Sequence, residues 1–486
     1  MTTIISIKGE IMISINIDEN KEKLIELFNN TSDLMVHEFI VGSAYRAAIG
    51  YIIGIIDKTI LEENIIKPLV KNLTSPYDIR STINSSNLLE VSNLEESITY
   101  ITNGSVILFI EGTETAYIIN ISKWPHRQVD RPTTEMVIRG PKEAFVEDIQ
   151  TNKTLLRHII KNNNLVIEDY ILGVQTNTIV SFVYIKGIVK ESVLEEARKR
   201  IQKLKIDSVL SSGYIEALIG GKKNGLTATI AYTEKSDIAA SKVLEGSIAI
   251  LCDGTPIVLT IPKLFVENLH SPEDYYINSI FATFLRIIRI IAFFMSFTLP
   301  GIFIALVLFH QEMVPTELLI SIAGQREGVP LSSPFEALLI ILFFELLKES
   351  GLRLPEAIGT AVTLVGGLVI GTAAVDAGII SATMVIVIAA TGMAEFVIPK
   401  LRESIAILRL IFLFLGSIAG LYGITCGLVF LFMHLVSLDS FGVPFMWPIA
   451  PFDKEGMKDS IVKFHISKLE FRPKPIAKRG AGKRVD

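Results

Sequence analysis

The chain has 486 residues, of which 50% are hydrophobic and 20% are charged, and its formal net charge is −5. Its two cysteines exclude a disulfide framework, and its histidines, without an HExxH pattern or paired metal-ligand spacing, exclude the common zinc sites. These averages conceal two halves, because charged and apolar residues mix up to residue 278 while long apolar runs dominate residues 287–438. A membrane helix needs about 20 mostly apolar residues, so we expect a soluble domain followed by membrane helices.

The first half of the chain predicts an α/β subdomain. The expected elements are strands over residues 33–42 and 45–57, a helix over 58–72 and a hairpin over 98–122. Asn103-Gly104 and Glu111-Gly112 are the turn signals of the hairpin region, because both pairs favour tight turns between apolar runs.

A second α/β subdomain is expected to follow. Its elements are a helix that begins at Pro141, strands over 165–172 and 178–188, a helix over 191–204 and a hairpin over 247–262. Asp253-Gly254 is the expected turn of that hairpin. We assign residues 1–162 and 163–278 to the two subdomains. The start of the chain has no basic segment followed by an apolar one, so we expect no cleaved signal peptide and a cytoplasmic location for both.

Residues 279–438 predict a helical membrane domain that crosses the bilayer several times. The first apolar run is interrupted at Pro300-Gly301, where we expect the span to break. The other runs are residues 334–355, in which about 11 apolar residues are interrupted by Glu345, residues 357–375 and 378–399 on either side of Asp376, and residues 405–438. Run 334–355 is too short for a standard span, so we expect it to be short, kinked or re-entrant. The last run is either one tilted helix or two short ones that break near Gly420–Gly423.

Charge predicts the topology of these runs. Residues 439–486 form a basic tail, and positive charge favours the cytoplasmic side of a membrane. With the N-terminal domain also inside, the number of crossings is even. We expect six, counting the short run and splitting the last one; the alternative is four, with the glutamate-rich run outside and the last helix unbroken. A tail held at a membrane surface also argues against nucleic acid as a partner.

Several ordered segments resemble the A subunit of spore germination receptors, the GerA family. Among them are "RPTTEMVIRGPKEAFVEDIQTNKTLLR", "EGSIAILCDGTPIVLTIP", "LPGIFIALVLFH", "QREGVP", "ELLKESGLRLPEAIG", "LVGGLVIGTAAVDAG" and "SFGVPFMWPIAP". The resemblance covers nearly the whole chain. Its departures, such as Ala144 where the family usually has glycine before "FVED", do not touch the Gly-rich helix.

The resemblance implies a subunit of a nutrient receptor in the inner membrane of a bacterial endospore. In that family a transporter-like B subunit is thought to bind the germinant, and the C subunit is a lipoprotein on the outer face. The A subunit is proposed to oligomerise into a pore. Small nutrients then trigger the release of monovalent cations, which starts germination.

The residues themselves support a pore through the small side chains of run 357–375. One stripe, spaced by three or four positions on a helix, is expected to pack against other helices at close range: Thr363, Gly367, Gly371, Ala374 and Gly378. A second stripe, about 100° round the helix, is the candidate pore lining: Val362, Gly366, Val369, Ala373 and Asp376. Its two valines are the bulky apolar members, so they are expected to form a hydrophobic constriction.

Each polar candidate in this half also has a purely structural interpretation. We interpret Asp376 first as a cap of the following helix, and second as a carboxylate at the pore mouth. Glu336 and Glu345 either line a cation path or pair across subunits, or they lie on the interface side of an amphipathic helix. Arg326 and Glu327 form either a salt-bridged loop or a solvated turn.

The predicted function is therefore a germinant-gated channel subunit that forms a homo-oligomer in lipid. The alternatives are a secondary transporter, which the interrupted spans suggest, and a non-conducting scaffold of a membrane receptor. We find no P-loop, no dinucleotide motif and no nucleophile–base–acid set, so we expect neither an enzyme nor a cofactor.

Overall fold

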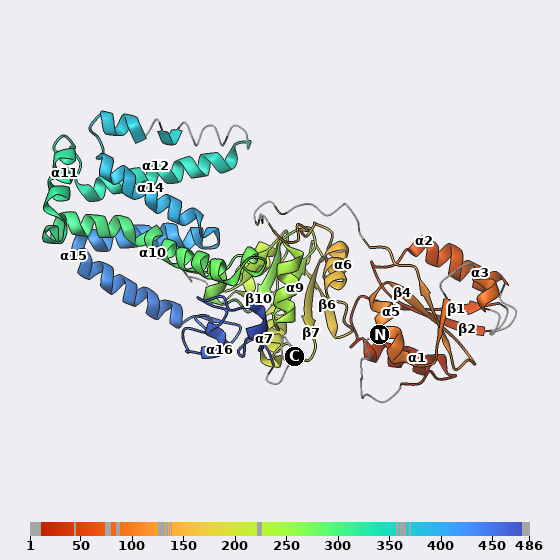
Figure 1. The fold of residues 1–486 in the computed structure, drawn as a ribbon. Helices are drawn as coiled ribbons and strands as arrows, with labels where there is room; N and C mark the ends of the chain where they lie inside the picture. Colours follow the sequence, from red (N-terminus) through yellow and green to blue (C-terminus); the bar gives the residue numbers. More distant parts are fainter. Residues whose placement is uncertain are drawn as a thin grey trace.

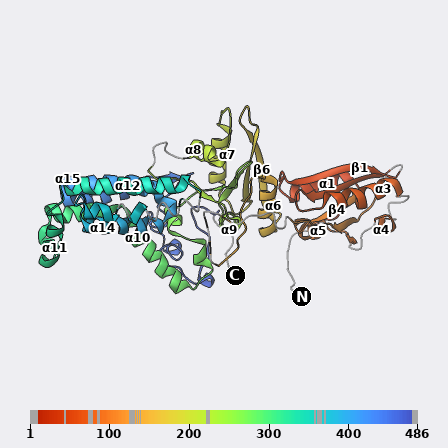
Figure 2. The same ribbon diagram turned by 90° about the horizontal axis from the view of Figure 1, so that it is seen from above.

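The computed structural model describes residues 11–42, 45–72, 79–83, 88–124, 132, 135, 137, 139–220, 226–355, 359, 366–368 and 371–478. Its three parts lie in a row (Figure 1). A first α/β lobe is followed by a second one, and a bundle of long helices extends from the far side of the second lobe. The view from above shows the same order (Figure 2).

The first lobe is a five-stranded antiparallel sheet in the order β1-β2-β4-β5-β3. Its strands are β1 (Leu34–Val41), β2 (Tyr45–Ile52), β3 (Leu88–Val91), β4 (Ser105–Ile110) and β5 (Ala116–Asn120). Its helices are α1 (Ile17–Leu27), α2 (Lys58–Ile60), the π-helical η1 (Leu61–Ile66), α3 (Lys67–Asn72), α4 (Ile79–Thr82) and α5 (Leu94–Thr102). Glu111-Gly112 does connect two paired strands. Asn103-Gly104 is not a hairpin turn: it ends helix α5, where Gly104 takes a φ of +91° that other residues rarely adopt.

The second lobe has the same kind of sheet, in the order β6-β7-β9-β10-β8. Its strands are β6 (Leu165–Leu172), β7 (Thr178–Ile185), β8 (Ala231–Thr233), β9 (Ile248–Cys252) and β10 (Val258–Ile261), and its helices are α6 (Ile149–Ile159), α7 (Glu191–Gln202), α8 (Ser212–Ile219) and α9 (Ser236–Leu244). The turn at Asp253-Gly254 lies between β9 and β10 as expected.

Helix α6 begins later than the sequence predicts and belongs to the second lobe. The segment after Pro141 is not helical, because Ala144 pairs with Lys235 as an isolated bridge and Asp148 caps the helix instead. Leu156 of α6 shares a buried cluster with Ile167 of β6. The division between the lobes therefore falls between residues 124 and 149 rather than at residue 162.

The two lobes are joined by a buried ion pair. Arg157 donates to both carboxylate oxygens of Asp33 at 2.8 Å, and both side chains are almost fully buried. Burial raises the pKa of Asp33, but the Arg157 guanidinium more than offsets this and holds the pKa below its ordinary value. The Ser32 amide donates to the Ile167 carbonyl across the same junction at 3.0 Å. These contacts hold the lobes in one orientation.

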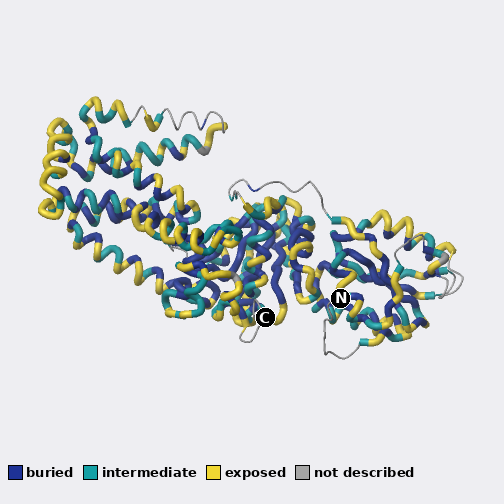
Figure 3. The backbone as a smooth tube through the Cα atoms, viewed as in Figure 1, coloured by how far each residue is buried: buried dark blue, intermediate teal, exposed yellow. Residues whose placement is uncertain are grey.

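The helical bundle follows the second lobe through the 3₁₀ turns η2 (Phe265–Leu269) and η3 (Pro272–Tyr275). Its elements are α10 (Ser279–Phe309), η4 (Gln311–Met313), α11 (Thr316–Arg326), α12 (Ser333–Arg353), the helical residues 366–368 and 371–376, α14 (Ala382–Phe396), η5 (Pro399–Leu401) and α15 (Arg402–Val436). Among the described residues, two helical stretches are long and apolar enough to cross a membrane, Ser279–Phe309 and Pro399–Val436. Helix α11, at the far end of the bundle, is mostly exposed (Figure 3).

Two expectations about chain breaks in the bundle have opposite outcomes. The predicted break at Pro300-Gly301 is wrong, because α10 continues through both residues. The last run does reverse, at Gly420, whose φ of 60° and ψ of −144° are not helical. After the reversal, a Cβ added to Gly423 would lie 2.4 Å from the Leu415 carbonyl oxygen, so the two halves of α15 lie against each other.

The segment after α15 is folded rather than a free tail. It contains β11 (Asp439–Ser440), β12 (Val443–Pro444), α16 (Lys454–Met457) and η6 (Ile466–Lys468). Phe441 and Ile476 belong to the buried core of the second lobe, and Ala477 pairs with Val189. The chain therefore leaves the second lobe at α10 and returns to the same lobe. Residues 479–486 lie outside the described part of the chain.

Candidate functional site

The interior of the bundle contains four charged side chains from three helices, which we call the inner charge cluster: Glu345 and Lys348 of α12, Glu395 of α14 and Arg409 of α15. The Lys348 ammonium lies 2.8 Å from each oxygen of Glu395 and 2.9 Å from Glu345 Oε1. Arg409 donates to Glu345 Oε1 at 3.0 Å and to Glu395. These two carboxylates and two cations balance one another, and the partly exposed Arg402 adds a longer contact, with 3.8 Å from its Nε to Glu395 Oε1.

Arg409 also explains why α10 stays helical at Pro300. A proline has no N–H, so it leaves the carbonyl four residues earlier, that of Ser296, without its helical partner. Arg409 Nε donates to this carbonyl at 3.0 Å. An unsatisfied backbone group among apolar helices costs on the order of several kcal/mol, and the hydrogen bond from Arg409 removes that cost.

Because members of the inner charge cluster are buried, its stability depends on keeping every charge paired. Arg409 is 1% exposed and Glu395 is 2% exposed. Isolated charges in such a place are expensive, whereas paired and hydrogen-bonded ones are tolerated. The cluster therefore fixes how α12, α14 and α15 lie relative to one another.

Replacing Arg409 with glutamine should destabilise the bundle strongly. The variant buries one uncompensated negative charge and leaves the Ser296 carbonyl without a donor, and breaking a buried pair in this way costs about 3–5 kcal/mol. Thermal unfolding of the purified protein in detergent measures the loss. Arg353→Gln is the matched control, because Arg353 is 78% exposed and its pair with Glu349 should contribute less than about 1 kcal/mol. Equal losses in the two variants would contradict this role.

A second group of polar residues, the outer polar cluster, surrounds the start of α14: Gln325, Arg326, Glu336, Ser381 and Thr383. Ser381 caps α14 by accepting from the Met384 amide. The Ser381 amide and hydroxyl both donate to Glu336, which is fully buried. Gln325 accepts from the Thr383 amide at 3.1 Å. Side chains of α11 and α12 thus satisfy the first amides of α14, where the helix dipole favours a carboxylate.

The outer polar cluster brings two of the predicted residues together. Arg326 Nε lies 4.0 Å from Glu336 Oε2, and both atoms are buried without a hydrogen-bond partner among the described residues. The partner of Arg326 is thus Glu336, ten positions later in the chain, rather than its neighbour Glu327, which is exposed. Glu345 pairs with Lys348 and Arg409 of its own chain, whereas the sequence interpretation was a cation path, a pair across subunits or a position on the interface side of the helix.

The helical residues 366–368 and 371–376 before α14, which we call the small-residue helix, have a side that faces their own bundle and a side that does not. Ala374 packs against the apolar cluster of α12 and α14, and a Cβ on Gly366 would lie 2.8 Å from Leu347 of α12. Gly371 lies near Val385 of α14, with 3.9 Å from its Cβ position to Val385 Cγ1. Ala373 and Asp376 are exposed.

Three of the predicted residues, Val362, Thr363 and Val369, lie outside the described part of the chain. Of the predicted packing residues, Gly367 is exposed, and a Cβ on it would meet nothing within 4 Å. Of the predicted pore-lining residues, Gly366 packs within its own chain instead, whereas Ala373 and Asp376 lie on the exposed side.

Two predicted residues have roles that differ from the expectation. Gly378 lies beyond the helix, where a φ of +64° and the bond from the Ile379 amide to the Ala374 carbonyl form a glycine C-cap. Asp376 is not the cap of the next helix, because Ser381 takes that position. The cap therefore lies closer to α14 than the sequence indicated. For the exposed Asp376, the interpretation as a carboxylate at a pore mouth stays a prediction.

The first turns of α10 are tied to the second lobe by another buried carboxylate. Asp274 accepts from Arg289 at 2.7 and 2.9 Å and from Arg286 at 3.1 Å. Burial raises the pKa of Asp274, but the hydrogen bonds from Arg289 offset this and hold the pKa below its ordinary value. Arg286 also donates to Asp459 of the C-terminal segment at 3.2 Å. The second lobe, the C-terminal segment and the helical bundle therefore contact one another around Asp274 and Arg286.

Sequence reasoning missed two members of the inner charge cluster, Glu395 and Arg409. Each is a single charge inside an otherwise apolar run, at "GMAEFVIP" and "IAILRLIFLF". A lone charge in a membrane-like run is the signal that could have identified them, because such residues usually face a partner.

Comparison with known proteins identifies the family. Residues 22–475 match the family model described as Bacillus/Clostridium GerA spore germination protein. "Spore germination protein KA" of Bacillus subtilis is 39% identical over 473 residues, which cover 95% of this chain and 86% of that protein. "Spore germination protein GerLA" of Bacillus cereus is 34% identical over 94% of this chain and 95% of that protein.

A solved structure is also similar to part of the chain. It is the N-terminal domain of the A subunit of the Bacillus megaterium spore germinant receptor GerK3. Its identity to this chain is 30%, and the match covers 53% of this chain and 99% of that one, with a TM-score of 0.41.

Proposed function

Because the chain belongs to the GerA family of spore germination receptor A subunits, we propose that several copies of it assemble into a cation channel that opens when the receptor binds its germinant. The receptor would lie in the inner membrane of the spore. Released monovalent cations would then start germination.

The observation that carries this proposal is the exposed side of the small-residue helix. Ala373 and Asp376 point away from the bundle to which their helix belongs, while Ala374 packs into it. A pore at the axis of a ring of subunits needs such a side, with small residues and a carboxylate that face neither the chain's own helices nor a bulky neighbour. Gly367, with open space beside it, allows another backbone to approach.

The path of the chain supports an even number of membrane crossings. The bundle begins and ends at the second lobe, so both soluble parts lie on one side, which we propose is the cytoplasm. The reversal at Gly420 favours six crossings over four, because it divides the last apolar run into two antiparallel helices.

The partners follow from the family. We propose a transporter-like B subunit that receives the nutrient, a lipoprotein C subunit, further copies of this chain, and lipid around the bundle. Family members are receptor subunits rather than enzymes, which suggests a role without catalysis. The secondary transporter loses its main support, because α10 is continuous at Pro300 and offers no broken helix.

Trimming the predicted constriction tests the channel in spores. Val362→Ala or Val369→Ala should leak cations without germinant, because smaller apolar side chains lower the barrier to wetting of a hydrophobic gate. The measurement is the potassium content of mutant spores together with the receptor level. Leu364→Ala is the control, since helical spacing puts position 364 about 200° away from position 362. Normal ion content with normal receptor levels in both valine variants would remove this helix from the pore.

A further inference from the structure

The second lobe contains a cavity that neither the channel nor the inner charge cluster uses. Its volume is about 550 Å³, which lies within the usual range for sites that hold small organic molecules. Its walls come from α9, the strands β8 and β10, the turns η2 and η3, and the C-terminal segment. Lys400 of η5 also lines it, so the cavity lies beside the turns η2 and η3 that lead into α10.

Lys263 lies in the wall of this cavity with its charge unmatched. The residue follows β10, is 4% exposed, and its backbone amide is held by the Ser440 hydroxyl at 3.0 Å. Among the described residues, none forms an ion pair or hydrogen bond with its ammonium group. Burial, helped by the positive charge of Lys400, lowers the pKa of Lys263 to about 8, and the carboxylates of Glu267 and Glu216 only partly oppose this.

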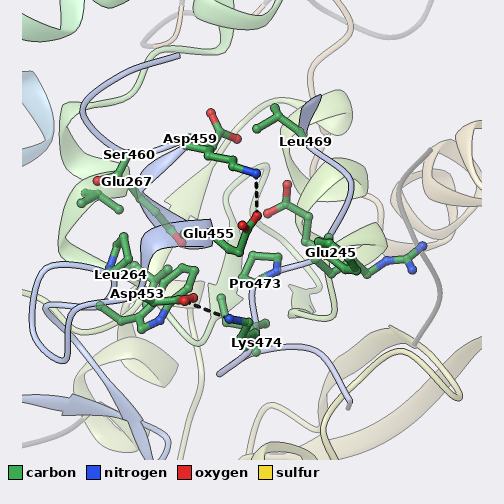
Figure 4. Close-up of a pocket in the computed structure, with 18 of the residues that line it drawn as sticks. Glu245, Leu264, Glu267, Asp453, Glu455, Asp459, Ser460, Leu469, Pro473 and Lys474 are labelled. Atoms are coloured by element: carbon green, nitrogen blue, oxygen red, sulfur yellow. Dashed lines mark hydrogen bonds and ion pairs between the residues drawn. The ribbon is translucent and has the colours of Figure 1, made fainter. Parts of the chain in front are cut away.

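The neighbouring cations are paired, which sets Lys263 apart. Lys242 pairs with Glu267 at 2.7 Å, and Lys400 pairs with Glu135 at 3.3 Å. In the adjoining smaller pocket (Figure 4), Lys474 pairs with Asp453 at 2.9 Å, and Lys458 pairs with Glu455. A buried lysine without a partner costs stability, so its retention needs another reason.

The cavity also contains hydrogen-bond acceptors that lack donors. The side-chain oxygen of Asn268 and one oxygen of Asp237 are buried and have no partner among the described residues. The second oxygen of Asp237 already accepts from the Tyr276 hydroxyl at 2.9 Å. An unmatched cation and unsatisfied acceptors on residues that line the same cavity point to a ligand that carries both an anionic group and hydroxyl donors.

We propose that this cavity binds a small hydroxylated oxyanion, whose phosphate or carboxylate group pairs with Lys263 and whose hydroxyls donate to Asn268 and Asp237. A lysine ammonium suits either anionic group, because it acts as a compact point charge. The site adjoins η3, whose Asp274 holds Arg286 and Arg289 of α10. Its occupant would therefore contact the junction between the lobe and the bundle.

Calorimetric titration of the full-length protein in detergent tests this site. The probes are glucose 6-phosphate and gluconate, which distinguish a phosphate ester from a hydroxycarboxylate, and glucose is the uncharged control. Saturable binding of either anion but not of glucose is expected, and Lys263→Met should weaken it at least tenfold. Lys199→Met removes the same charge from an exposed position on α7 and should leave the affinity unchanged.

Two further readouts separate a ligand site from a structural lysine. Without ligand, Lys263→Met should raise the melting temperature of the second lobe, because it removes an unmatched buried charge; a structural lysine would lower it. Affinity should fall about tenfold per pH unit above pH 8, as the Lys263 ammonium loses its proton. His270 does not contribute to this fall, because burial lowers its pKa to about 3.

Three results would overturn the proposal. The first is the absence of saturable binding of both anions by the unaltered protein. The second is equal affinity in the unaltered protein and in Lys263→Met. The third is loss of binding in both lysine variants, because it would indicate attraction by overall charge rather than a built site.

Discussion

Replacing Gly416 with alanine is expected to destabilise the helical bundle, although alanine is the better helix former. The backbones of α10 and α15 touch at this point. A Cβ on Gly416 would lie 2.4 Å from the Gly301 carbonyl oxygen, and a Cβ on Gly301 would lie 2.4 Å from the Phe412 carbonyl oxygen. The two helices must separate to admit either methyl group, at a cost in the range of about 1–3 kcal/mol that overpacking usually brings. Gly416→Val should exceed this.

The control for this prediction is a glycine-to-alanine substitution at a helical position where the added methyl group meets no other atom. Gly324 of α11 is helical, and a Cβ there would meet nothing within 4 Å. Gly324→Ala should therefore stabilise the protein slightly, by up to about 1 kcal/mol, because alanine loses less backbone entropy in a helix. Thermal unfolding in detergent measures whether each variant is more or less stable than the unaltered protein. A neutral or stabilising Gly416→Ala would show that α10 and α15 do not pack in this way.

Local patterns predicted much of the α/β lobes from the sequence. Strands β6 and β7 and the turn at Asp253-Gly254 stand where apolar runs and turn residues indicated them. The errors at Asn103-Gly104 and Pro141 arose because one local signal has two structural uses. An Asn-Gly pair ends a helix as readily as it turns a hairpin. A Gly-Pro pair can mark a loop, and a proline can also begin a helix.

The bundle shows what single-sequence patterns miss. Pro300 predicted a break, but the donor that repairs the helix, Arg409, lies more than one hundred positions later in the chain. Likewise Glu345, Glu395 and Arg409 come together only through the packing of three helices. Periodicity within one run contains no information about such pairs. It assigned Gly366 to the pore-lining stripe and Gly367 to the packing stripe, whereas Gly366 packs against Leu347 of α12 and Gly367 is exposed.

Potassium efflux from liposomes that contain the purified, assembled chain decides whether the exposed side of the small-residue helix lines a pore. The variant to reconstitute carries Val369→Ala, which should conduct without germinant, and serines at Cys252 and Cys426 to remove the natural thiols. Ala373→Cys then introduces one thiol on the exposed side of the small-residue helix. Gly371→Cys is the matched control, because position 371 faces Val385 of α14 in the same chain.

We predict that a positively charged thiol reagent reduces the efflux at least tenfold in Ala373→Cys and leaves it nearly unchanged in Gly371→Cys. A bulky cation attached to the pore lining blocks the passage of other cations, whereas one attached beside α14 does not. Equal effects on both variants would remove Ala373 from the pore. The absence of efflux from all variants, with the oligomer intact, would contradict the channel itself.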